Sequence, residues 1–194
     1  MKKMNRREFL TLTGAAVVAL SLAGCSGGPS APPAPPAAPT GKEAELLAAI
    51  NKVWKEKHAL GLVKNEQLIF NQDAVGTIRA YGRVFEEANE TPHKLKDSDN
   101  KIIFEELNGL EDKILEKYGE GSLAGMAGVS EPSTDKVVTL EDKYSCDDTA
   151  VRAFVDKLLN SNSNSSKAEY ISIYCPVVQG KTYMTAIAFL NNKP

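Results

Sequence analysis

Apolar and polar side chains alternate most regularly in the last stretch of the chain, from Ala168 to Leu190. Two runs rich in β-branched and aromatic residues, 170–175 and 182–190, flank a Gln179-Gly180 pair, and this arrangement is typical of a β-hairpin. One face of the first run collects apolar side chains, namely Ile171, Ile173 and Cys175. The second run is apolar on both faces, so we predict a strand that is covered on both sides.

Three upstream stretches carry apolar residues at the spacing of an amphipathic helix. The first, 40–59, opens with the capping-box pattern of a threonine followed three residues later by a glutamate. The second is predicted to begin at Asn71 or Asp73, either of which can cap a helix, and to end before residue 92. The third is predicted over 147–159.

The other segments of the domain are shorter. A glycine-rich stretch, 119–128, is predicted to lead into or contain a strand, and 136–140 is a further strand candidate. Residues 110–118 are predicted to add a helical segment. Helices that precede a hairpin with two apolar faces predict an α+β fold, namely an α-β-α sandwich with a central antiparallel sheet.

The N-terminal segment carries targeting signals. Four basic residues precede an apolar run, 10–23, that is too short to be assigned as a membrane span. Asn5-Arg-Arg-Glu-Phe-Leu10 resembles the twin-arginine export signal, and Leu22-Ala-Gly-Cys25 resembles the bacterial lipobox, whose cysteine is lipidated and becomes the mature N-terminus. We therefore predict a signal peptide over 1–24 and lipidation of Cys25. An ordinary secretory signal is the alternative for each motif, and the export route stays open.

A tether and one domain follow the signal peptide. Residues 26–40 are rich in Gly, Ser, Pro and Ala, and their Pro-Pro pairs favour an extended chain of roughly 40–50 Å at about 3.1 Å per residue. With Cys25 they form the predicted tether. Residues 41–194 have the length of one ordinary domain.

The charge of the mature chain excludes some partners. Residues 1–24 hold four of the 23 basic residues and one of the 25 acidic residues, so the mature chain carries a net charge of about −5. This charge argues against nucleic-acid binding. We expect contact with the membrane through the lipid on Cys25, at the extracytoplasmic face of the cell membrane.

The two other cysteines, Cys146 and Cys175, are predicted to form a disulfide. They are the only thiols left once Cys25 is lipidated, and export places them outside the reducing cytoplasm. A helix over 147–159 packed antiparallel on the strand ending at Cys175 would bring them together, because the two elements have similar lengths. The alternative is a pair of free thiols that pack as small apolar side chains.

Several motifs resemble the CAP superfamily of cysteine-rich secretory, antigen 5 and pathogenesis-related 1 proteins. His93-Lys-Leu-Lys-Asp-Ser-Asp is similar to the His-Thr-Arg-Pro-Asp-Gly loop of that family, and Gly180-Lys-Thr-Tyr-Met-Thr-Ala-Ile-Ala-Phe189 is similar to its closing strand. His58-Ala-Leu-Gly61-Leu62 and Asn71 are similar to the end of its first helix and the start of its second. The resemblance covers nearly all of 41–190 and implies the CAP type of α-β-α sandwich.

The resemblance also implies candidate cleft residues. His93 matches the first of two family histidines, and Glu120 in Gly119-Glu120-Gly-Ser-Leu-Ala matches one family acid. The segment that carries the second histidine is absent here, since polar Asn and Ser residues follow the third helix. One histidine with one or two carboxylates is too few ligands for a zinc site, so we predict no metal and no cofactor. The structural alternatives are a loop-bracing or solvent-exposed His93 and an ordinary surface Glu120.

These observations predict a membrane-anchored lipoprotein whose CAP-like domain binds a ligand or cell-envelope component that the sequence does not identify. The alternative is a metal- or histidine-assisted hydrolase of cell-wall or peptide substrates, with His93 as the base and Glu120 beside it. No nucleophile motif, phosphate-binding loop, dinucleotide-binding motif or calcium loop occurs in the sequence. We therefore expect binding rather than catalysis.

Overall fold

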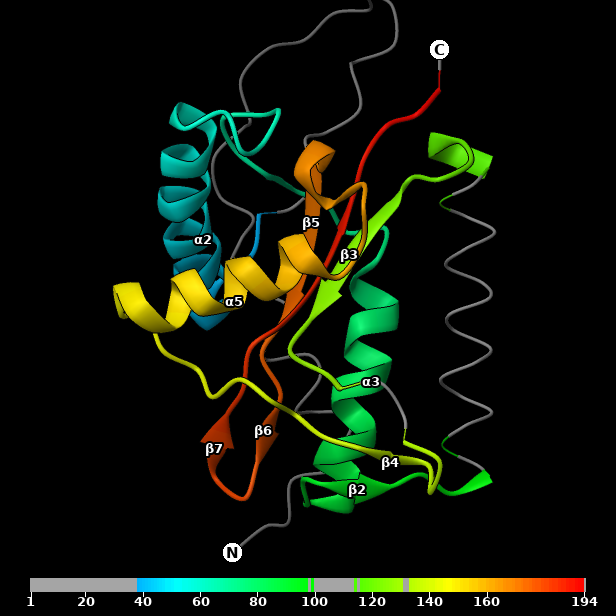
Figure 1. Cartoon of the computed structure of the whole chain (residues 1–194). Helices are drawn as coiled ribbons and strands as arrows, with labels where there is room; N and C mark the ends of the chain where they lie inside the picture. Colours follow the sequence, from blue (N-terminus) through cyan, green and yellow to red (C-terminus); the bar gives the residue numbers. More distant parts are fainter. Residues whose placement is uncertain (1–37, 98, 100–113, 115, 131–132, 194) are drawn as a thin grey trace, which may run out of the picture. The chain divides into compact units, whose positions relative to one another are not determined.

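The computed structural model describes residues 38–97, 99, 114, 116–130 and 133–193 (Figure 1). The predicted signal peptide, Cys25 and nearly all of the tether lie outside these residues, as does most of the predicted helical segment 110–118. The elements, in chain order, are α2 (Gly41–Ala59), β1 (Ile69–Phe70), α3 (Val75–Ala88), β2 (His93–Lys94), β3 (Leu123–Ala127), β4 (Val137–Val138), α5 (Asp148–Asn160), the 3₁₀ turn η1 (Ser165–Lys167), β5 (Tyr170–Tyr174), β6 (Val177–Val178), β7 (Lys181–Thr182) and β8 (Thr185–Phe189).

The main sheet has the strand order β1-β5-β8-β3. β8 is antiparallel to both β5 and β3, whereas β1 is parallel to β5. The sheet is therefore mixed, which confirms the α+β class but corrects the prediction of a purely antiparallel sheet. The residue ahead of β1 is held from outside the sheet, because the side-chain amide of Asn51 on α2 bonds both the N–H (2.8 Å) and the carbonyl (3.0 Å) of Leu68.

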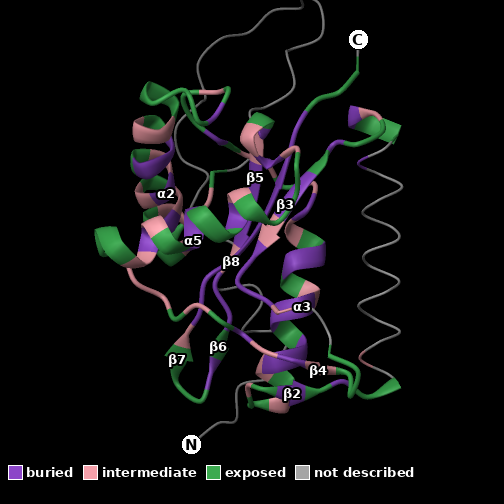
Figure 2. Ribbon diagram, in the orientation of Figure 1, coloured by how far each residue is buried: buried purple, intermediate pink, exposed green. Residues whose placement is uncertain are grey.

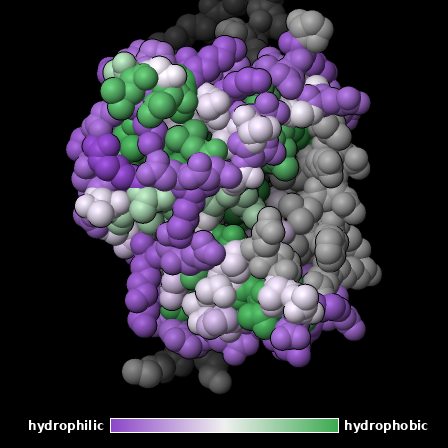
Figure 3. Space-filling view, in the orientation of Figure 1, coloured by the Kyte–Doolittle hydropathy of each residue, from purple (hydrophilic) through white to green (hydrophobic). Residues whose placement is uncertain are grey.

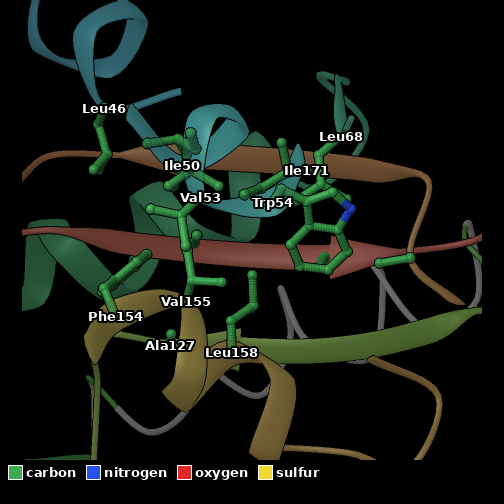
Figure 4. Close-up of a cluster of buried hydrophobic side chains, with 14 of the residues drawn as sticks. Leu46, Ile50, Val53, Trp54, Leu68, Ala127, Phe154, Val155, Leu158 and Ile171 are labelled. Atoms are coloured by element: carbon green, nitrogen blue, oxygen red, sulfur yellow. The ribbon is translucent and has the colours of Figure 1, made fainter. Parts of the chain in front are cut away.

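Helices cover both faces of this sheet. On one face, α2 and α5 bury the largest group of apolar side chains against β3, β5 and β8, and Trp54 and Phe154 are fully buried within it (Figure 4). On the other face, α3 packs on the opposite side chains of β8, including Ile187 and Phe189. Figure 2 shows the resulting concentration of buried residues on the strands and on the inner sides of the helices.

The two faces predicted for the last strands are confirmed. The apolar face of β5, with Ile171 and Ile173, lies under α2 and α5, and every residue of β8 is buried. The predicted hairpin is confirmed: β5 and β8 pair antiparallel, and the chain between them reverses at the predicted turn, which lies directly between the short strands β6 and β7. Gln179 and Gly180 have φ angles of 50° and 72°, the left-handed values that a two-residue hairpin turn requires.

The helix boundaries follow the predictions to different degrees. Asp147 caps α5 as predicted, since its carboxylate accepts from the N–H of Ala150 at 3.0 Å. The predicted capping box of α2 is wrong, because Thr40 makes no side-chain cap bond. α3 begins later than predicted, because Asn71 binds the N–H of Asp73 and forms a turn ahead of the helix.

Candidate functional site

His93, the histidine predicted for a cleft, is buried on β2. Its side chain is 3% exposed, and each ring nitrogen meets a carboxylate: Nδ1 lies 2.6 Å from Glu90 and Nε2 lies 3.0 Å from Asp99. Phe85 packs against the ring edge to face, with ring centres 6.5 Å apart. Burial by itself lowers the pKa of His93, but the hydrogen bonds to Glu90 and Asp99 outweigh it and raise the pKa above the ordinary value.

This arrangement makes His93 a link between chain segments. Its strand pairs with β4, and Asp99 also accepts from the N–H of Lys96 at 2.8 Å. Both ring nitrogens are engaged and the ring is shielded from solvent, so the imidazole has no free nitrogen for a substrate proton. Of the two structural alternatives for His93, the structure shows the loop-bracing one.

Glu120 lies far from His93. It is exposed, and its backbone carbonyl oxygen accepts a hydrogen bond from the side-chain amide of Asn192 at 2.8 Å. Tyr118, two residues earlier, donates to Asp73 at the start of α3, whereas His93 packs on Phe85 near the end of that helix. The helix rises by ten residues from Val75, just after Asp73, to Phe85, which corresponds to about 15 Å. The structure therefore does not bring His93 and Glu120 together.

Metal-ligating side chains do not converge in the part of the chain that the structure describes. No group of three or more His, Cys, Asp and Glu side chains there has the arrangement of a metal site. Glu90 and Asp99 lie close to one histidine, but they approach opposite nitrogens of its ring. Two carboxylates on either side of an imidazole stabilise its charged form, and a protonated imidazole cannot coordinate a cation.

Cys146 and Cys175 are free thiols, so the predicted disulfide is absent from the structure. Cys146 is exposed just ahead of α5, and its Sγ lies 3.3 Å from the hydroxyl of Tyr144. Cys175 is buried at the end of β5, and burial, followed by the charges of Glu43 and Cys146, raises its pKa to about 12. The thiol of Cys146 is held against a tyrosine on the surface, whereas the thiol of Cys175 is buried.

Among the residues that the structure describes, two surface hollows could hold a ligand. The larger, about 560 Å³, lies beside α2 and the segment before β1. Several of its polar side chains are already engaged in the fold: Lys55 pairs with Glu66 at 2.7 Å, Lys52 pairs with Asp148 at 3.2 Å, and Asn51 holds the backbone ahead of β1. A ligand would have to displace these contacts.

The smaller hollow, about 290 Å³, lies where α2, α3 and the end of β5 meet. Arg79, Glu43 and Tyr174 line it from these three elements. The guanidinium carbon of Arg79 lies 5.7 Å from the ring centre of Tyr174, over its face, and Arg79 forms no ion pair with any carboxylate of the described residues. Its charge is therefore available to an anion that enters the hollow.

The residues around Arg79 also favour an anion in the smaller hollow. Tyr174 is held by Glu86, which accepts its hydroxyl hydrogen at 2.9 Å; burial and then Glu86 raise the tyrosine pKa to about 12, so the ring stays neutral. Val75, in the first turn of α3, also lines the hollow, and the preceding Ala74 has no side chain that can cap the helix. The positive end of the helix dipole therefore adds to the charge of Arg79.

Sequence reasoning did not find this site. Arg79 occupies an exposed position of an amphipathic helix, which is typical of a solvated surface arginine. Glu43 belongs to the predicted capping box, where its role would be local. Only the packing of α2 and α3 around the end of β5 brings the two residues to one hollow.

No protein-family model, curated protein or solved structure matches the chain. Membership of the CAP superfamily therefore stays a prediction. Among the helices that the structure describes, none is both long and apolar enough to cross a membrane.

Proposed function

We propose that the chain is a membrane-anchored extracytoplasmic lipoprotein whose domain, a divergent CAP-like α-β-α sandwich, works by binding. In this proposal a lipid on Cys25 holds the protein at the outer face of the cell membrane, and residues 26–40 tether the domain. The domain binds a small anionic group in the hollow between α2, α3 and β5. A carboxylate or a phosphate, free or at the end of a longer molecule, has the required chemistry.

One observation supports this proposal above the others: an arginine without an acidic partner lines a hollow. The planar guanidinium of Arg79 binds a carboxylate or phosphate through two parallel hydrogen bonds. Its contact with the Tyr174 ring restricts the side chain before a ligand arrives, which lowers the entropy cost of binding. Glu43 on the opposite element favours a ligand that also carries a positive or hydrogen-bond-donating group.

The size of the hollow limits the affinity. A volume of about 290 Å³ accommodates a ligand fragment of amino-acid or dipeptide size. One charge-assisted pair contributes about 1.5–3 kcal/mol in net terms, which by itself corresponds to a dissociation constant on the order of 10–100 mM for an isolated fragment. A longer natural ligand would add contacts outside the hollow.

The hydrolase alternative receives no support from the candidate residues. It requires His93 as a base next to Glu120, and these residues lie near opposite ends of α3. His93 is also fully engaged by two carboxylates. We therefore do not propose a catalytic role for either residue.

Titration calorimetry of the full-length chain in detergent tests the binding site. We use acetyl-alanyl-alanine, which has one free carboxylate, and compare it with the same dipeptide as its amide. The free acid is expected to bind about tenfold more tightly, and Arg79→Gln should abolish this difference because it removes about 1.4 kcal/mol of ion pairing. Arg83→Gln is the matched control, since Arg83 lies one turn further along α3, is exposed and faces Glu87 at 3.9 Å. Equal affinities for acid and amide, or an equal loss with Arg83→Gln, would contradict the assignment.

Cell fractionation tests the anchor separately. The wild-type chain is expected in the membrane fraction, and Cys25→Ala should move it to the soluble fraction or leave it as an unprocessed precursor. Membrane association that is unchanged in Cys25→Ala would reject the lipid anchor, whatever the calorimetry shows.

A further inference from the structure

The turn that follows α2 displays two leucines to solvent. Leu60 is 74% exposed and Leu62 is 56% exposed, and they are the two most exposed large apolar residues of the described chain. Figure 3 shows hydrophobic surface gathered over this end of α2. The two leucines therefore form an apolar tip, which we call the leucine turn.

The leucine turn is ordered by its own backbone. The N–H of Gly61 donates to His58 at 2.9 Å, and the N–H of Leu62 donates to Lys57 at 3.0 Å. Gly61 has a φ of 72°, which lets the chain reverse between the two leucines. The leucines therefore point outward from a fixed turn, and burying them elsewhere would break these bonds.

The charges around the leucine turn are suited to an anionic surface. The N–H of Lys64 donates to Ser166 at 2.8 Å, which brings Lys64 and Lys167 alongside the turn. Neither lysine forms an ion pair with a described residue. Two nearby acids are already neutralised by bases, because Glu56 pairs with Arg152 and Glu66 pairs with Lys55.

We propose that the leucine turn contacts the bilayer to which the protein is anchored, with the leucines in the interface and the two lysines at anionic lipid headgroups. Exposed apolar side chains next to basic ones are the pattern by which a protein surface enters such an interface. This inference rests on the proposed lipid at Cys25. It adds the orientation of the domain, with the C-terminal end of α2 toward the membrane.

The length of the tether allows this orientation. The tether joins the domain at the start of α2, and this helix of 19 residues is about 28 Å long. The fifteen residues 26–40 would span about 46 Å at about 3.1 Å per residue if they adopt the extended conformation that the sequence predicts. A lipid on Cys25 and the leucine turn therefore reach the same membrane surface.

Fluorescence quenching in vesicles tests the contact. The full-length lipidated chain is reconstituted into vesicles of phosphatidylcholine and phosphatidylglycerol, with or without bromine atoms on the acyl chains. Leu62→Trp is expected to lose about half of its added emission to the brominated lipid, because a tryptophan in the interface lies near the acyl chains. The native Trp54 is fully buried and provides the constant background.

Thr134→Trp is the matched control, because Thr134 is exposed in the turn directly before β4. In Figure 1, β4 lies at the other end of the domain from the end of α2. Its emission should be the same in both kinds of vesicle. Adding Lys64→Glu and Lys167→Glu to Leu62→Trp should reduce the quenching about twofold, since a lysine near an anionic surface strengthens the contact and a glutamate opposes it. The reduction should disappear in vesicles that contain phosphatidylcholine alone.

The outcomes separate the contact from the anchor. A chain that floats with the vesicles but shows no quenching at position 62 overturns the contact and leaves the anchor intact. A chain that does not float rejects the anchor, and with it this inference. The emission of Leu62→Trp could instead depend on protein concentration and not on brominated lipid. That result would show that the leucine turn contacts a second copy of the chain, and it would also overturn the proposal.

Discussion

Replacing His93 tests whether this residue stabilises the fold. We choose His93→Leu, because a leucine side chain can keep an apolar contact with Phe85 while it removes the hydrogen bonds to both Glu90 and Asp99. The imidazole is 3% exposed, whereas Asp99 is 20% exposed and Glu90 is 54% exposed. The bond to Asp99 therefore accounts for most of the expected loss, because the Glu90 carboxylate is rehydrated when its partner is removed.

The size of the loss follows from burial, and its pH dependence follows from the pKa. Leaving one partly buried carboxylate without its cationic partner costs about 2–3 kcal/mol, below the full cost of a completely buried pair. The pKa of His93 is raised in the folded state, so the stabilisation is complete below the unfolded pKa of about 6.5. It is lost as the pH rises through the folded pKa.

Urea unfolding followed by the fluorescence of Trp54, the only tryptophan, measures this effect. At pH 6 the midpoint for His93→Leu should fall by about 1–2 M urea, given a slope of about 1.5–2 kcal/mol per molar. Between pH 6 and pH 9 the wild-type protein should lose stability relative to the variant, so the two converge. His58→Gln, at an exposed position in the last turn of α2, should change the free energy of unfolding by less than about 0.5 kcal/mol. A difference between wild type and His93→Leu that stays constant over this pH range would refute the role of the ion pairs.

Three further predictions concern the fold. Gly128→Ala should destabilise the domain by more than about 3 kcal/mol, because a Cβ atom there would lie 2.0 Å from a backbone carbonyl oxygen. Gly180 also has a positive φ but has open space around it, so Gly180→Ala should cost only about 1 kcal/mol. Thermal unfolding of the two variants measures the difference. Asn51→Leu should cost about 2 kcal/mol, because it removes both side-chain bonds to the backbone before β1, and faster hydrogen exchange in β1 should accompany the loss. Alkylation of the denatured, non-reduced protein should modify both Cys146 and Cys175, and in the native protein Cys146 should react first because Cys175 is buried with a raised pKa; a mass lower by two hydrogens without alkylation would instead show a disulfide.

Local patterns in the sequence were sufficient for the parts of the fold that depend on neighbouring residues. Alternation along 170–175 and 182–190 predicted which side chains of β5 and β8 face each layer of helices, because a strand places successive residues on opposite faces. Asp147 was identified as a cap for a similar reason, since its carboxylate bonds an N–H only three residues away. The Gln179-Gly180 turn was also found, because its left-handed backbone is a local property.

The features that remained unpredicted depend on contacts between segments far apart in the sequence. β1 is only two residues long and has no alternating pattern, so its parallel pairing depends on Asn51 and on β5, which lies about a hundred residues later. Packing also decides which charged residues lie together. It buries His93 between two carboxylates and separates it from Glu120. It brings Arg79 and Glu43 to one hollow. The sequence by itself determined the faces of the helices and strands, because these follow from backbone periodicity. Tertiary structure decided the candidate site, because the role of a charged side chain depends on which partners the packing of distant segments places next to it.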